Sequence, residues 1–292
     1  MAAKIIDGKA LAAEVRAEVA RDARALGARD VQPGLATVLV GDDPASRTYV
    51  SSKQKACAEV GIAVWDHHLD ASTSQDDLLS LVARLNDDER VHGILVQLPL
   101  PSQIEEQAVL EAVRPDKDAD GFHPCNLGRL LAGDAVVAPA TPAGIQQMLV
   151  RSGIETFGAH VVVVGRSNIV GKPLAAMMMQ KGPGANATVT VCHTGTRDLA
   201  RHTSAADVVV AAVGRAKTIT APMIAPGAVV VDVGMNRTDE GLVGDVDFAA
   251  VRDVASAITP VPGGVGPMTI AMLLRNTVTL AERAAHGHVP SS

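Results

Sequence analysis

The sequence predicts two α/β domains with a cleft between them, the C-terminal one containing a doubly wound parallel sheet. Short β-branched runs alternate with longer helical patterns over nearly the whole chain, which is typical of βαβ units. The length of 292 residues corresponds to roughly two domains. Hydrophobic residues make up 47% and charged residues 20%, a globular composition that excludes a disordered chain.

In the first half, the pattern predicts three strands separated by helices, at residues 35–40, 62–69 and 91–98. One of these helices is clearly marked. Asp43 is a suitable N-cap, Pro44 occupies the first helical position, and Gly61 ends the helix after Val60.

In the second half, the pattern predicts five buried strands, at residues 160–165, 187–192, 207–213, 228–234 and 255–260. Such a set predicts a complete nucleotide-binding sheet. Stretches rich in Pro and Gly at 137–144 and 260–267 indicate two crossings between the domains, and the last helix is expected to return to the first domain. The predicted domains are therefore 1–140 plus 268–288, and 141–267.

Composition argues against several kinds of partner. The chain has one Trp, one Tyr and three Phe, and a net charge of −6, so nucleic acid is not expected as a partner. Three widely spaced cysteines without a C-x-x-C pair favour a reducing, cytoplasmic compartment. The uncharged stretch 254–274 is interrupted by prolines and glycines, so no membrane span is expected. No histidines have the spacing of a metal site on a helix, and no metal is expected.

The strongest motif is VVVVGRSNIVGKP at 161–173, where a hydrophobic strand runs into a Gly-rich turn and an apolar helix. Gly165 permits the tight bend, Gly171 allows close packing, and the helix N-terminus offers N–H groups to an anion. The motif predicts a Rossmann-like dinucleotide site, although it lacks the usual G-x-G-x-x-G; the alternative is a turn that serves only the backbone. Arg166 lies in the turn and no carboxylate ends the next strand, which favours NADP over NAD.

Tyr49 and Lys53 lie four residues apart on the marked helix, so their side chains project from one face. Beside a phenol in a desolvated cleft, a lysine has a lowered pKa and becomes a usable acid or base near neutral pH. The alternative is a snorkelling lysine next to a packed tyrosine.

Two further polar residues are candidates. Gln97 lies at the C-terminal end of a strand, the edge at which parallel sheets bind ligands; the alternative is a surface amide. Asp120 lies in the loop PDKDADGFHPCNLG at 115–128, which lacks the glutamate that a calcium loop carries at its twelfth position. Its carboxylate suits a heterocycle bearing N–H donors, or it caps a turn.

Five motifs in order resemble those of the bifunctional methylenetetrahydrofolate dehydrogenase/cyclohydrolase family: YVSSK (49–53), VQLPLP (96–101), DADGFHP (118–124), GRSNIVGKP (165–173) and PVPGGVGPMT (260–269). The resemblance extends from residue 4 to residue 283. It implies a cytosolic homodimer in one-carbon metabolism. That enzyme oxidises 5,10-methylenetetrahydrofolate with NADP to 5,10-methenyltetrahydrofolate, then hydrolyses the product to 10-formyltetrahydrofolate.

The resemblance also implies roles for single residues. Lys53 would be the main catalytic residue, and Tyr49 would order it and the substrate. Gln97 would tune the protonation of Lys53, and Asp120 would grip the pterin ring. The implied substrate-binding set is Tyr49, Lys53, Val96, Gln97, Leu98, Asp120, Pro262, Gly263 and Gly264. The implied cofactor-binding set is Gly165, Arg166, Ser167, Thr194 and Met235.

Two departures from the family pattern are present. Ala119 stands where the family often has valine, and no basic residue follows Thr194 directly, although Arg197 is close. Alternatives that stay open are a member with one activity, an NAD-dependent member, and a non-catalytic nucleotide-binding module. In the homodimer, strand 187–192 or its neighbours would supply part of the interface.

Overall fold

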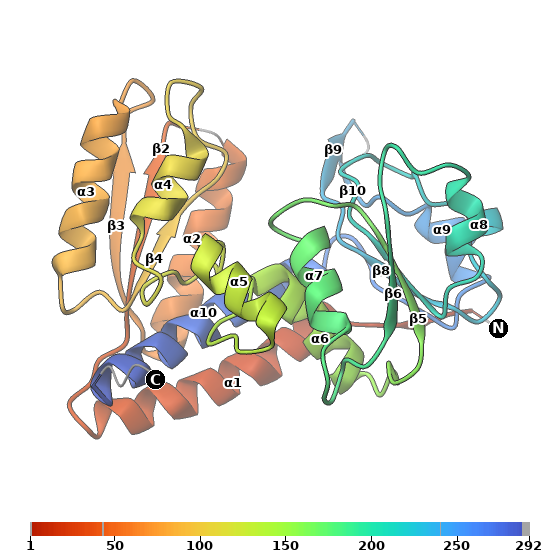
Figure 1. Ribbon diagram of the computed structural model, residues 1–292, viewed down its shortest axis with the longest axis horizontal. Helices are drawn as coiled ribbons and strands as arrows, with labels where there is room; N and C mark the ends of the chain where they lie inside the picture. Colours follow the sequence, from red (N-terminus) through yellow and green to blue (C-terminus); the bar gives the residue numbers. More distant parts are fainter. Residues whose placement is uncertain (1, 43, 240, 288–292) are drawn as a thin grey trace. The chain divides into compact units, whose positions relative to one another are not determined.

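The computed structural model describes residues 2–42, 44–239 and 241–287, with the backbone alone for 44–51. The chain divides into two compact units: unit 1 is Met1–Ala13 with Pro139–Thr269, and unit 2 is Glu14–Ala138 with Ile270–Ser292. Both are α/β units built on parallel sheets, which confirms the predicted fold class (Figure 1). Residues 2–13, which the sequence pattern placed in the first domain, belong to unit 1, where the short strand at residues 4–5 joins the sheet.

Unit 1 contains a six-stranded parallel sheet in the order β1-β11-β8-β7-β5-β6. Its strands are β1 (Lys4–Ile5), β5 (His160–Val164), β6 (Thr188–Cys192), β7 (Val208–Ala211), β8 (Val229–Asp232) and β11 (Ala257–Ile258). The chain runs from β5 to β6 on one side and then crosses to β7 on the other. This reversal of strand order is the topological switch point of a doubly wound sheet, outside which ligands bind.

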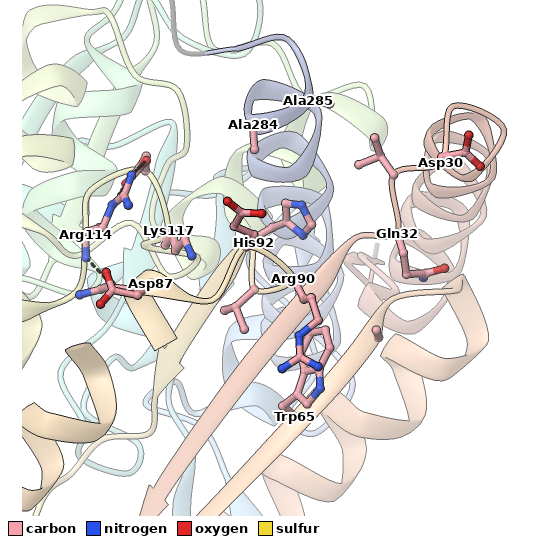
Figure 2. Close-up of a pocket in the computed structure, with 16 residues that line it drawn as sticks. Asp30, Gln32, Trp65, Asp87, Arg90, His92, Arg114, Lys117, Ala284 and Ala285 are labelled. Atoms are coloured by element: carbon pink, nitrogen blue, oxygen red, sulfur yellow. Dashed lines mark hydrogen bonds and ion pairs between the residues drawn. The ribbon is translucent and has the colours of Figure 1, made fainter. Parts of the chain in front are cut away.

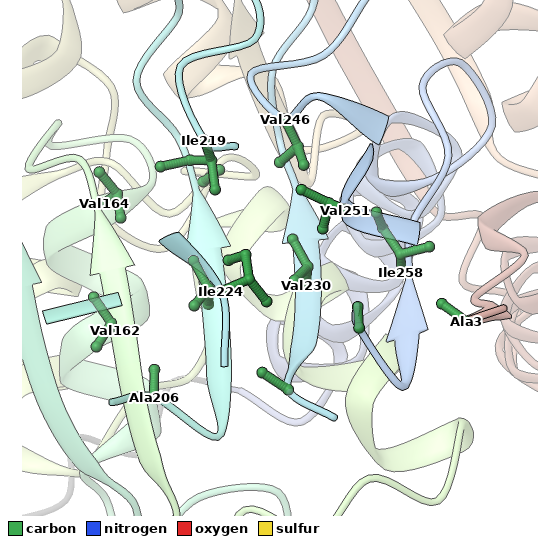
Figure 3. Close-up of a cluster of buried hydrophobic side chains, with 14 of the residues drawn as sticks. Ala3, Val162, Val164, Ala206, Ile219, Ile224, Val230, Val246, Val251 and Ile258 are labelled. Atoms are coloured by element: carbon green, nitrogen blue, oxygen red, sulfur yellow. The ribbon is translucent and has the colours of Figure 1, made fainter. Parts of the chain in front are cut away.

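Helices and one hairpin complete unit 1: α6 (Ala140–Arg151), α7 (Gly171–Met178), α8 (Leu199–Thr203), η1 (Ala221–Met223), β9 (Asn236–Thr238), β10 (Gly241–Val243) and α9 (Phe248–Arg252). The strands consist mostly of valine because both faces of the sheet are covered. Figure 3 shows one such layer, in which Val162 on β5, Val230 on β8 and Ile258 on β11 belong to one apolar cluster with Val251. The strand predicted at 255–260 is only two residues long.

Unit 2 contains a three-stranded parallel sheet in the order β3-β2-β4, formed by β2 (Gly34–Val40), β3 (Ala63–Leu69) and β4 (Gly93–Val96). Its helices are α2 (Pro44–Val60), α3 (Gln75–Asp87), α4 (Glu106–Ala112) and α5 (Pro124–Ala132). Helix α2 has the predicted limits, while its expected N-cap Asp43 lies outside the described residues. Helices α1 (Gly8–Gly27) and α10 (Val265–Ala285) each contribute residues to both units.

The central strand β2 is buried along its whole length, and it fixes the site end of the sheet. The last ladder bond of its pair with β4 runs from the Gln97 N–H to the Val38 carbonyl, at 2.8 Å. Gln97 is therefore the first residue beyond β4 at the carboxyl edge. Within the described part of the chain, no helix is long and apolar enough to cross a membrane.

Candidate active site

Lys53 and Gln97 form the polar centre of unit 2. Lys53 lies on α2 and is 4% exposed, and its Nζ donates a hydrogen bond of 3.0 Å to Gln97 Oε1. The Gln97 Nε2 donates to the Leu98 carbonyl at 2.9 Å, which turns Oε1 toward the lysine. Tyr49 lies one turn earlier on α2, but its side chain is outside the described residues.

Burial brings the titration of Lys53 close to neutral pH. Burial lowers the pKa of Lys53 from 10.5 to about 8, while the negative charge of Asp120 opposes that fall. Burial also raises the pKa of Asp120 to about 6, an effect that Lys53 opposes and Asp118 reinforces. A proton can therefore leave or join Lys53 at a small energetic cost near neutral pH.

Asp118 holds the loop that carries Asp120. Its buried carboxylate accepts hydrogen bonds from the N–H groups of Gly121 and His123, at 3.0 and 2.8 Å, and from Asn126 Nδ2 at 2.9 Å. Its backbone also bridges to Ile94 on β4. Asp118 is not among the site residues predicted from the sequence. An Asp three residues before a Gly is a turn signal that could have identified this structural role.

The remaining predicted substrate residues divide between the two units. Val96 belongs to the apolar core of unit 2, so only its backbone is available to a ligand. Leu98 follows Gln97 and is partly buried. Pro262, Gly263 and Gly264 lie in unit 1, in the loop between β11 and α10.

In unit 1, the Gly-rich turn after β5 has the geometry of a phosphate cradle. Gly165 has φ +136°, and a Cβ on it would collide with the Ala212 carbonyl oxygen beyond β7. A Cβ on Gly171 would collide with the Gly165 carbonyl in the same way. Ser167 Oγ accepts the N–H of Val170 at 3.1 Å, at the start of α7. The backbone is thus packed closely at the switch point, where a dinucleotide pyrophosphate fits.

The other predicted cofactor residues lie at the same edge of that sheet. Arg166 follows β5, Thr194 lies two residues beyond β6, and Met235 lies three residues beyond β8. All three are exposed, Met235 by 61%. Because the carboxyl ends of parallel strands share one edge, the five predicted cofactor residues lie along one rim of unit 1.

Unit 2 also contains a hollow of about 840 Å³, whose lining includes neither Lys53 nor Gln97 (Figure 2). Its lining includes Trp65 with Arg90 stacked 5.6 Å from the ring centroid, and His92 just before β4. Gln97 follows the other end of β4, so this hollow belongs to the amino edge of the sheet. None of the predicted site residues lines it.

Two family models match the chain. The model for the NAD(P)-binding domain of tetrahydrofolate dehydrogenase/cyclohydrolase matches residues 139–285, and the model for the catalytic domain of that family matches residues 6–120.

Individual proteins are similar over nearly the whole length. Bifunctional protein FolD of Dehalococcoides mccartyi is 57% identical over 292 residues, covering 98% of this chain and 99% of that protein. The crystal structure of the bifunctional enzyme FolD from Campylobacter jejuni has a TM-score of 0.93 at 47% identity, covering 97% of this chain and 100% of that one. The Trypanosoma brucei enzyme, complexed with NADP cofactor and inhibitor, has a TM-score of 0.92 at 39% identity, covering 98% and 100%.

Proposed function

Because the chain belongs to the tetrahydrofolate dehydrogenase/cyclohydrolase family, we propose a division of its two reactions between residues of its two units. The chain is a bifunctional enzyme of one-carbon metabolism. It oxidises 5,10-methylenetetrahydrofolate to 5,10-methenyltetrahydrofolate, and it hydrolyses that product to 10-formyltetrahydrofolate.

For hydrolysis, Lys53 moves the protons. The methenyl carbon is already cationic, so water adds to it without further activation and one proton leaves the added water. A second proton then passes from the new hydroxyl to the departing nitrogen as one C–N bond breaks and the formyl C=O forms. The observation that carries this role is the buried Lys53 ammonium on Gln97 Oε1, with a pKa of about 8. Each transfer is then feasible near neutral pH.

For the oxidation, bound NADP would supply the hydride acceptor for the methylene carbon, and no side chain has to supply a proton. Unit 1 holds the cofactor through Gly165, Ser167 and the start of α7. NADP is preferred to NAD because Arg166 is exposed beside the turn and β6 ends without a carboxylate that would repel a 2′-phosphate. Thr194 and Met235 extend this site along the rim.

Several side chains are assigned to the folate. Asp120, half-buried and close enough to Lys53 to perturb its pKa, accepts hydrogen bonds from the pterin ring. Tyr49 orders the substrate and Lys53, while Val96 and Leu98 contact the substrate around Gln97. Pro262, Gly263 and Gly264, within residues 261–269, are also assigned to folate binding.

A single assay tests both reactions. NADP and 5,10-methylenetetrahydrofolate are added to the enzyme, and the methenyl absorbance is followed. We expect it to rise and then to decay faster than in a reaction stopped by removing the protein. An unchanged absorbance contradicts the dehydrogenase, and a rise without accelerated decay contradicts the hydrolase.

We further propose that the enzyme is a homodimer joined along β6. This strand forms the edge of the unit 1 sheet, and within the described residues it pairs only with β5. Val191 on β6 and Phe157 are exposed by 37% and 73%, an apolar surface that a second copy would cover. Gel filtration with light scattering should give twice the 30.1 kDa chain mass, and a lower mass for Val191→Lys. A wild-type monomer at assay concentration contradicts the dimer.

The enzyme is expected in the cytoplasm. Its three cysteines, Cys57, Cys125 and Cys192, are all unpaired with one another, which suits a reducing compartment. Fractionation of cells that express the tagged chain checks this, and recovery from an oxidising compartment contradicts it.

A further inference from the structure

Two carboxylates are buried at the carboxyl edge of the unit 1 sheet. Asp245 is fully buried and Asp232 is 2% exposed. Neither belongs to the predicted cofactor set. Burial raises the pKa of Asp232 to about 6, so keeping this group charged in the fold is costly. A buried carboxylate can fix the positions of its hydrogen-bond donors, which an apolar side chain of the same size cannot do.

Asp245 joins the ends of two strands. Its Oδ2 accepts the N–H groups of Val213 and Gly214, just beyond β7, at 2.6 and 2.9 Å. Its Oδ1 accepts Asn236 Nδ2, beyond β8, at 2.8 Å. The Asp245 side chain therefore fixes the backbone after β7 and also holds Asn236, the residue that follows Met235.

Asp232 holds Asp245 in place. Its Oδ1 accepts the N–H groups of Gly234 and Asp245, both at 2.9 Å, and its Oδ2 accepts the N–H of Val246 at 3.0 Å. The chain makes room for both acids with glycine. A Cβ on Gly234 would collide with Asp245 Oδ1, and a Cβ on Gly244 would collide with Asp232 Oδ2.

The location connects this network to the cofactor. Strand β7 is the first strand on the far side of the switch point, and the Ala212 carbonyl at its end lies against Gly165 of the phosphate turn. In a doubly wound sheet, one half of a dinucleotide lies over each side of that point. The half over β7 and β8 is the nicotinamide half, because Arg166 and the end of β6 serve the 2′-phosphate half.

We propose that Asp245, held by Asp232, is a positioning residue for the nicotinamide half of the cofactor, acting through the backbone of Val213 and Gly214. This inference rests on the proposed use of unit 1 as the NADP site. An amide at position 245 would turn either a donor or a weaker acceptor toward these two N–H groups. The backbone at the rim would then lose its fixed position, without any change in the residues of the phosphate turn.

The test measures cofactor binding directly in Asp245→Asn. We expect the dissociation constants of NADP and NAD to rise together, by about tenfold or more, with their ratio unchanged. Hydrogen exchange at residues 211–216 should accelerate. Hydrolysis of added methenyltetrahydrofolate needs no cofactor and should stay within about twofold of wild type.

Asp207→Asn is the matched control. Asp207 also accepts a backbone N–H, that of His160 at 2.7 Å, but at the amino edge of the same sheet. It should leave both dissociation constants unchanged. If Asp245→Asn does not fold, Asn236→Ala removes one hydrogen-bond partner of the same carboxylate. It should raise the dissociation constants of both cofactors by a smaller factor.

Three outcomes overturn the inference: unchanged cofactor binding in the variant that folds, a change confined to NADP, or hydrolysis that falls in step with binding. The last would mean a general loss of structure. Failure of the proposed function is distinguishable, because wild type would then bind neither cofactor.

Discussion

Gln97 Oε1 accepts the hydrogen bond of Lys53 Nζ at 3.0 Å, joining the end of β4 to the interior of α2 across 44 residues of sequence. The bond stabilises the charged lysine, whereas burial favours the neutral one. The protonation of Lys53 near pH 8 is therefore a balance that its neighbours set.

Substitution of Gln97 should shift this balance in either direction. Gln97→Leu removes the hydrogen-bond acceptor of the Lys53 ammonium, so the pKa of Lys53 should fall. The pH range over which kcat for hydrolysis rises should then move to lower pH. Gln97→Glu places a carboxylate beside the Lys53 ammonium, so the pKa of Lys53 should rise and the rise of kcat should move to higher pH. Each shift should be about one pH unit. Profiles of kcat against pH, corrected for hydrolysis without enzyme, measure both, and shifts in the same direction contradict the role of Gln97.

Asp120→Asn should weaken folate binding more than it slows chemistry. The amide keeps the shape but removes the charged acceptor that we propose for the pterin, so KM for the folate should rise about tenfold. Loss of its negative charge should also lower the pKa of Lys53, which Asp120 raises. Asp116→Asn, on the same loop, is the control. An unchanged KM in Asp120→Asn would remove Asp120 from the binding site.

Much of this site could be predicted from local sequence. Lys53 lies on a helix with clear start and stop signals, and Gln97 follows a strand that ends before prolines. The Asp232–Asp245 network could not be predicted. Each acid stands between valines and glycines like an ordinary turn residue, and only the tertiary approach of β7, β8 and the hairpin reveals its partners.

The short elements were missed for a related reason. Strand β1 has two residues and the hairpin strands β9 and β10 have three each, too few to show an alternating pattern. Strand β1 forms because β11 offers it an edge, as the pairing of Lys4 with Ala257 shows. Such pairing depends on the completed sheet rather than on propensity.

The buried charge of Lys53 should lower the stability of the fold. Its folded-state pKa is lowered from 10.5 to about 8, so the penalty for charging it is fully present below pH 8 and disappears as pH rises above 10.5. Lys53→Met should raise the free energy of unfolding at pH 7 by as much as about 3 kcal/mol, and by less at pH 10. Urea unfolding at both values measures this. Lys55→Met, exposed on the same helix, should show no such dependence.

Arg166 should set the choice of cofactor. Arg166→Gln removes the guanidinium beside the phosphate turn, so the dissociation constant of NADP should rise about tenfold while that of NAD stays nearly constant. Arg197→Gln tests whether the second basic residue contributes, and Arg201→Gln on α8 is the control. An equal rise in the dissociation constants of NADP and NAD in Arg166→Gln would contradict a contact between Arg166 and the 2′-phosphate.

The most direct test of the role of Lys53 uses Lys53→Gln in the coupled assay. With NADP and 5,10-methylenetetrahydrofolate, the methenyl absorbance should rise, because hydride transfer needs no proton from Lys53. It should then persist, decaying only at the rate measured without enzyme. Decay at the wild-type rate would show that another group moves the protons and would contradict the proposed mechanism.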